Sequence, residues 1–335
     1  MKRTIGGRRM RLLATYFNQE RIVFALTVLL LILFALTLPN FLSPSNLLSL
    51  VRSVAVLGIL GLGMLVVVLG RGIDLSLVAT MAISVAWSLQ LAASGISVTG
   101  AMTIGLLFAL GMSLITGILI AYAEIPSLFA TLAMATFIYG FGRAHLITGT
   151  DVVYLPTNIG PIAGVGQGVL FGIPMPIIVA AIVALIAFLF LRYTKPGRFI
   201  YAIGDNLATA RIGGVPVRPI LVAQYVIAGG IAFVAGIVTA TSAQAMNTRV
   251  VNSNMIYDVI LVVVLGGVGL SGGRGNVRNV IVGSLLIGVL MNGMTIMDVQ
   301  YTIQNVIKSL ILLLAIVVDS VLNPRDEQTG QQGDI

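Results

Sequence analysis

Residues 47–69 read LLSLVRSVAVLGILGLGMLVVVL, an apolar run in which Arg52 is the only charged residue. A helix needs about 20 apolar residues to cross a bilayer, so this run predicts a membrane-spanning helix. The same criterion predicts ten spans in all, at residues 22–38, 47–69, 75–93, 101–123, 127–147, 169–191, 220–241, 255–270, 280–296 and 301–318. Two of them, 75–93 and 255–270, are the least regular, and each could be broken or partly re-entrant.

The composition excludes the other broad classes of protein. Apolar residues make up 58% of the 335 residues and charged residues only 9%, against roughly 45–50% and 25% in soluble domains. There is no cysteine and one histidine, so neither a disulfide framework nor a metal site is expected. The chain is therefore expected to be an all-α, polytopic bundle of transmembrane helices.

The net charge of +8 does not indicate nucleic-acid binding, because the basic residues are dispersed between the apolar runs. With ten spans and a cytoplasmic N-terminus, fifteen of the 19 lysines and arginines fall on the inner side, as the positive-inside rule requires. The four exceptions lie at outer ends or within spans: Arg52, Arg143, Arg249 and Lys308. Both termini and residues 194–216 are thus predicted to be cytoplasmic.

The chain divides into a basic N-terminal segment at 1–21, a transmembrane permease domain at 22–322 and a polar tail at 323–335. The first apolar run, 22–38, is longer than a signal-peptide core of about 7–15 residues and lacks a small-x-small cleavage site. We therefore interpret it as an uncleaved first span. The tail is expected to be disordered.

Two short segments resemble each other. Val67-Val68-Leu69-Gly70 and Val263-Val264-Leu265-Gly266 each end an apolar run before a glycine-containing turn and a Leu-Ser pair. Paired interruptions in two halves are typical of transporters, but short matches in a chain rich in valine, leucine and glycine also arise by chance. Two explanations of this similarity therefore remain open: the chain has two related halves, or the match is a coincidence.

The longest inner loop is expected at residues 192–218. It predicts a short helix at 206–212, with Asp205 or Asn206 as the N-cap and Gly213 as the stop. The small side chains of Ala208 and Ala210 permit close approach to a partner. A solvated connector would need fewer and more polar residues, so we favour a docking surface.

A second inner loop, residues 270–276, is glycine-rich. A phosphate-binding P-loop needs a lysine followed by serine or threonine after its glycines, and this loop has none. The loop is interpreted as a tight turn, and no ATPase is expected in this chain.

Charges inside membrane spans are costly and suggest either structural pairing or a solute pathway. Asp74 begins a helix, which favours capping over a pathway role. Asp258 lies about one turn into its span, and Lys308 lies roughly 10 Å into its own. For Lys308, pairing and pathway lining are both open.

Several side chains near the outer helix ends are neutral amides: Gln244, Asn247, Asn252, Asn254, Asn292, Gln300 and Gln304. They suit a neutral polyhydroxylated solute, or they are helix–helix contacts worth about 0.6 kcal/mol each. With one histidine and few buried acids, a proton relay is not expected.

Three segments resemble the permease subunits of bacterial ribose-type sugar importers of the ATP-binding-cassette class. They are 72–76 (GIDLS), the inner loop from Gly197-Arg198 through Gly204-Asp205-Asn206 to Ala210-Arg211-Ile212-Gly213-Gly214, and Leu265-Gly266-Gly267 with the loop Leu270-Ser271-Gly272-Gly273-Arg274-Gly275. Gln304 and Lys308 also match that pattern. The chain departs from it at Arg71 and Val78, where glycine is usual, and at Ile256, where glutamate is usual.

The resemblance implies a ten-span permease of the bacterial inner membrane that carries a small neutral solute, such as a monosaccharide, and is no enzyme itself. It implies two permease copies, two cytoplasmic ATP-binding subunits, a periplasmic solute-binding protein and contact with membrane lipid, with residues 206–213 docked on the ATPase. It implies no cofactor and no nucleic acid. The opposing interpretation is a stand-alone secondary carrier or channel for a small polar solute.

Overall fold

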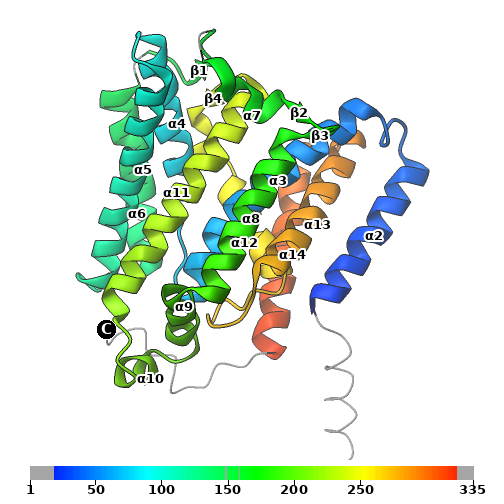
Figure 1. Ribbon diagram of the computed structural model, residues 1–335. Coiled ribbons are helices and arrows are strands. Elements are labelled where there is room, and N and C mark those ends of the chain that lie inside the picture. Colours follow the sequence, from blue (N-terminus) through cyan, green and yellow to red (C-terminus); the bar gives the residue numbers. More distant parts are fainter. Residues whose placement is uncertain (1–18, 148, 158, 323–335) are drawn as a thin grey trace, which may run out of the picture.

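The computed structural model describes residues 19–147, 149–157 and 159–322, which are almost entirely helical (Figure 1). A helix lies at each of the ten predicted spans: α2 (Gln19–Thr37), α3 (Pro44–Leu69), α4 (Leu77–Ala93), α5 (Val98–Ala121), α6 (Ser127–Phe141), α8 (Met175–Tyr193), α11 (Val217–Ala243), α12 (Met255–Leu265), α13 (Val277–Ile296) and α14 (Tyr301–Leu322). The all-α bundle is confirmed. Of the predicted terminal segments, residues 1–18 and 323–335 lie outside the described part.

Six of these helices are long and apolar enough to cross a membrane: α2, α3, α5, α8, α11 and α13. Three more, α4, α12 and the first part of α14, are shorter apolar helices. The tenth, α6, continues from Phe141 into a π-helical turn, η1 (Gly142–Leu146). A multi-pass membrane protein follows from this arrangement.

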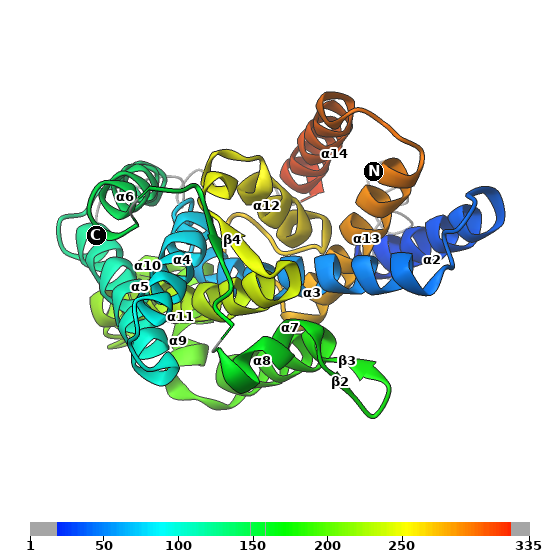
Figure 2. The ribbon, with the colours of Figure 1, turned by 90° about the horizontal axis from the view of Figure 1, so that it is seen from above.

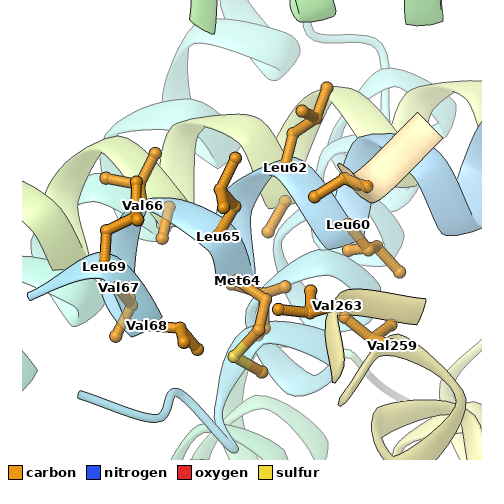
Figure 3. Close-up of a cluster of buried hydrophobic side chains, with 14 of the residues drawn as sticks. Leu60, Leu62, Met64, Leu65, Val66, Val67, Val68, Leu69, Val259 and Val263 are labelled. Carbon is orange, nitrogen blue, oxygen red and sulfur yellow. The ribbon is translucent and has the colours of Figure 1, made fainter. Parts of the chain in front are cut away.

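Helix α3 is the centre of the bundle. Its 26 residues pack against α8, α11, α12 and α13, and 72% of its apolar window is buried, against 17% for α2. Figure 3 shows Leu60 and Met64 of α3 beside Val259 and Val263 of α12. Other helices therefore surround α3 on most of its length, whereas the equally apolar α8 is mostly exposed.

Helix α2 stands at the edge of the bundle (Figure 2). A small cluster of Phe34, Phe41, Leu50 and Val289 joins it to α3 and α13. A separate cluster fills the space between α4, α5 and α6 on the other side. We call the end of the bundle that carries the strands the upper end, and the end that carries α9 and α10 the lower end, as Figure 1 shows them.

The upper end carries two short antiparallel strand pairs. Strand β1 (Val152–Tyr154) pairs with β4 (Ala245–Asn247), and β2 (Val169–Leu170) pairs with β3 (Ile173–Pro174). The predicted start of the sixth span at residue 169 is therefore wrong. Phe171 and Gly172 adopt positive φ angles of 51° and 79°, and this turn delays the helix until Met175.

The remaining short elements link these parts. They are η2 (Gly160–Ala163), α7 (Gly164–Gln167) and η3 (Thr248–Asn252) at the upper end. Asp151 bridges two of the exceptional basic residues there, at 2.9 Å from Arg143 and 2.6 Å from Arg249. Both arginines are thus paired at the upper end of the bundle.

Helix α12 ends at Leu265, five residues before the predicted end of the eighth span at 270. Its 11 residues extend about 16 Å at 1.5 Å each, roughly half of a 30 Å hydrocarbon core. The chain then continues as a loop of residues 266–276 that reaches the lower end before α13 begins. The predicted eighth span is therefore a short helix followed by a loop rather than one continuous helix.

The two segments that resemble each other end their helices in the same way. The amide of Arg71 donates to Val68 O and that of Gly72 to Val67 O, while Gly267 and Val268 donate to Val264 O and Val263 O. Arg71 and Gly267 both have positive φ angles, 68° and 95°. Because this helix ending is common, two related halves stay a prediction.

Candidate functional site

The predicted inner loop contains two helices rather than one: α9 (Lys195–Asp205) and α10 (Leu207–Ile212). Helix α10 and its N-cap are as predicted, since Asn206 Oδ1 accepts from the Thr209 amide at 2.9 Å. Helix α9 was missed, because Pro196-Gly197 suggests a turn. Thr194 caps it by accepting from the Gly197 amide at 3.1 Å, and Pro196 occupies its first turn, where no amide donor is needed.

Two glycines let α9 lie directly against the bundle. A Cβ atom on Gly197 would overlap the backbone of α8 at Phe190 and Leu191, and one on Gly204 would overlap Leu69 O and Gly273 N. Both sites leave no room for a side chain. Between them, the buried Ile200 and Ile203 attach α9 to the core, whereas Arg198 is exposed.

The glycine-rich loop packs beneath this segment rather than projecting as a free turn. The Gly273 amide donates to Leu69 O, the end of α3, at 2.9 Å, and Tyr201 of α9 donates to Gly275 O at 2.9 Å. Burial raises the pKa of the Tyr201 hydroxyl above its ordinary value, so the group stays protonated as the donor. Gly272, Gly273 and Gly275 have positive φ angles, and Arg274 is exposed.

Arg71 joins the end of α3 to the end of α9. Its Nε donates to Gly204 O at 2.9 Å and its Nη2 to Asp205 O at 2.7 Å. These are the last carbonyls of α9, where a cation is favoured. A Cβ on Gly272 would lie 2.6 Å from Arg71 Cγ, so the glycine makes room for the arginine. The sequence showed the departure at Arg71 but not this contact.

The exposed tip of α10 consists of Ala208, Thr209, Arg211, Ile212 and Gly213. Ile212 is 90% exposed, the largest value for an apolar side chain of these two helices. Ala210, which was expected to face a partner, is buried in the core of its own chain at 5%. The residue that offers an apolar contact is therefore Ile212, because α10 turns the Ala210 side of the helix inward.

A second candidate site lies between α12 and α14, where Asp258 and Lys308 form a buried ion pair. Lys308 Nζ is 2.7 Å from Asp258 Oδ1 and 3.0 Å from Oδ2. The two side chains are only 8% and 6% exposed. The ring of Tyr301 lies 5.9 Å from the same nitrogen. Lys308, for which pairing and pathway lining were open, thus has a partner within the bundle.

A cavity of about 160 Å³ adjoins this pair. Its polar walls come from Asn254, Tyr257, Asn305 and Ser309, besides the pair itself. Asn305 Oδ1 is buried and has no hydrogen-bond partner among the described residues. Neither Asn305 nor Ser309 was predicted from the sequence, although their spacing from Lys308 places all three residues on one helix face.

The remaining predicted site residues lie apart from this cavity. Asp74 is buried between α3 and α4 and accepts from the Ser76 amide at 2.9 Å and its hydroxyl at 2.6 Å. Gln304 donates to Val299 O at 2.8 Å, next to the start of α14. Asn292 exchanges two side-chain hydrogen bonds with Asn46 and so links α13 to α3.

Comparison with known proteins gives consistent matches over most of the chain. The family described as "Branched-chain amino acid transport system / permease component" matches residues 46–317. The chain is 32% identical to the ribose import permease protein RbsC of Escherichia coli K12, over 95% of this chain and 98% of that protein. It is 35% identical to RbsC of Bacillus subtilis, covering 87% and 89%, and 34% identical to the galactofuranose transporter permease protein YtfT of E. coli, covering 83% and 80%. No solved structure matches.

Proposed function

We propose, from the premise that this chain belongs to the family of branched-chain amino acid transport system permease components, that it is the membrane-spanning subunit of an ATP-driven monosaccharide importer in the bacterial inner membrane. It is a transport subunit and not an enzyme. The relatives it resembles over most of its length carry names of ribose, galactofuranose and L-arabinose transport. Because these relatives are named for different sugars, they support monosaccharides as the class of solute and do not single out one sugar.

The observation that carries the ATP-driven mechanism is the exposed tip of α10 on a segment tied to the core. Ile212 is available to a partner, while Gly204, Gly273 and Arg71 join α9 to the end of α3. A movement imposed on the tip by a partner would therefore reach the central helix. In this proposal residues 192–218 form the coupling loop within a permease domain at 22–322, between the segments 1–21 and 323–335.

The partners follow from this division of the molecule. Cytoplasmic ATP-binding subunits dock at the lower end, a periplasmic solute-binding protein at the upper end, and a second permease copy, identical or related, completes the pathway. Lipid covers exposed apolar side chains such as Leu107 and Leu36, which are 62% and 82% exposed. The distribution of basic residues assigns the lower end to the cytoplasm, and the same rule predicts both termini in the cytoplasm.

Partner dependence tests this function. We expect proteoliposomes that contain the chain, its ATP-binding subunit and its solute-binding protein to take up tritiated D-ribose or L-arabinose. This uptake should require ATP on the side of the membrane on which the ATP-binding subunit lies. Uptake by the chain alone, at a matched amount of protein, would instead support the stand-alone carrier or channel.

The orientation is tested by single cysteines, since the chain has none of its own. Asp205→Cys at the lower end is expected to react with a membrane-impermeant thiol reagent only after the cells are opened. Tyr154→Cys, 74% exposed at the upper end, is the matched control and should react in intact cells. Labelling of Asp205→Cys from outside would reverse the assigned topology.

The substitution Arg71→Gly tests whether the Arg71 side chain couples ATP hydrolysis to transport, without adding backbone strain. Glycine adopts the positive φ angle of this position without strain, so the fold should tolerate the change. The two hydrogen bonds to the end of α9 are lost. We expect complexes that assemble and hydrolyse ATP but transport several-fold less sugar per ATP, with Arg71→Lys intermediate. An unchanged ratio of uptake to hydrolysis would show that Arg71 has no part in coupling.

A further inference from the structure

We propose that the cavity between α12 and α14 is a contact site for the hydroxyl groups of a neutral polyhydroxylated solute during its passage. This inference rests on the function proposed above and adds to it a place in the chain. The cavity is about 160 Å³, below the roughly 300–1,000 Å³ of pockets that enclose a whole ligand. The cavity therefore accommodates only one hydroxylated edge of a solute. Such a contact is transient, because a solute in passage must also be released.

The cavity is built from two matching helix faces. Helix α14 contributes Asn305, Lys308, Ser309 and Leu312, and α12, with the residue before it, contributes Asn254, Tyr257, Asp258 and Leu261. Both sets follow the spacing i, i+3, i+4, i+7, which is one stripe of an α-helix. In each stripe the first three residues are polar and the fourth is leucine. The polar groups thus converge toward one end of the cavity and two leucines line the other.

The charges of the site favour a neutral solute. Asp258 and Lys308 are both more than nine-tenths buried and lie within hydrogen-bond distance of each other. They cancel as a pair, so a charged solute would gain no counter-charge there. A carboxylate has about four acceptor positions on its two oxygens, and Lys308 approaches one on each. The remaining positions accept hydroxyl donors without breaking the pair.

Asn305 supplies the observation that points to a missing partner. Its Oδ1 atom is buried without a donor among the described residues, and buried polar atoms are almost always hydrogen-bonded. A hydroxyl group from a solute, or from water that precedes it, satisfies this acceptor.

The test compares two substitutions on α14 in the complete complex. Asn305→Leu keeps the size of the side chain but removes its hydrogen bonds, and Thr302→Val does the same at an exposed position outside the cavity. We expect Asn305→Leu to lower uptake of tritiated D-ribose or L-arabinose about tenfold, the upper range for one lost hydrogen bond. Assembly and ATP hydrolysis should stay at wild-type level, as should every property of Thr302→Val.

Unchanged uptake by Asn305→Leu would overturn the proposal for this cavity and leave the importer function intact. A parallel loss of assembly would overturn it too, because Asn305 would then serve packing. Absence of uptake by the wild-type complex for both sugars would count against the proposed function and this inference together.

A second measurement does not depend on Asn305. Ser309→Cys should react with a water-soluble thiol reagent, and either sugar presented with the solute-binding protein should slow that reaction. Thr302→Cys, exposed near the start of the same helix and outside the cavity, should react at the same rate with and without sugar. Equal rates for Ser309→Cys with and without sugar would overturn the proposal.

Discussion

Replacement of Lys308 by leucine is expected to lower strongly the recovery and the thermal stability of the folded protein. The change leaves the Asp258 carboxylate, only 8% exposed, without its counter-charge inside the bundle. Removing one partner of a buried pair costs about 3–5 kcal/mol, a large share of the 5–15 kcal/mol that stabilises a typical protein. The measurement is the yield of monodisperse protein in detergent and its thermal unfolding midpoint, at matched levels of synthesis.

The double variant Asp258→Leu/Lys308→Leu is the control, because it removes both charges and fills the site with apolar groups. Such replacements are often neutral or stabilising, so the double variant should regain most of the thermal stability that the single variant loses. If Lys308→Leu is as stable as the wild type, the charge of Asp258 reaches water and the pair has no structural importance.

Replacement of Ile212 by aspartate is expected to separate the permease from its ATP-binding subunit. Ile212 is 90% exposed on α10, so the substitution disturbs no packing within the chain. If Ile212 is a hot spot of this interface, its loss costs about 2 kcal/mol or more, which weakens the complex by roughly 30-fold. The measurement is co-purification of the ATP-binding subunit and sugar uptake, at equal permease content in the membrane.

Phe171→Asp provides a matched control for this variant. Phe171 is 93% exposed at the upper end, so it loses an equally accessible apolar side chain far from α10. Its complex with the ATP-binding subunit should be recovered normally. Normal recovery of Ile212→Asp complexes would show that the tip of α10 is an ordinary connector. Ala210→Trp is a poorer probe, because Ala210 is buried and overpacking alone costs about 1–3 kcal/mol.

The bundle was largely predictable because membrane helices must be long and apolar, and that requirement is visible in a single segment. Errors arose where local turns compete with the apolar pattern. The hairpin at 169–174 continues the apolar run of α8, so hydropathy alone cannot separate them. Helix α9 begins at Lys195 with Pro196 and Gly197 in its first turn, and the cap at Thr194 and close packing against the core stabilise it.

The candidate sites were predicted less completely, since they depend on contacts between distant segments. Lys308 was recognised as a buried charge, but its pairing with Asp258 across 50 positions has no local signal. The orientation of Ala210 depends on how α10 turns against α9. Arg71 stood out only as a departure from glycine, and its role becomes apparent once α9 lies beside the end of α3.

The shortness of α12 has a consequence for the biosynthesis of the protein. Helix α2 can leave the translocon alone, since its 18-residue apolar window is long enough to span. The 11 residues of α12 include Asp258 in the first turn, and a carboxylate opposes membrane insertion, at most by about 2.5–3.5 kcal/mol when it lies at a helix centre. Its neutralising lysine is synthesised 50 residues later. We therefore expect α12 to enter the bilayer together with α13 and α14 rather than alone.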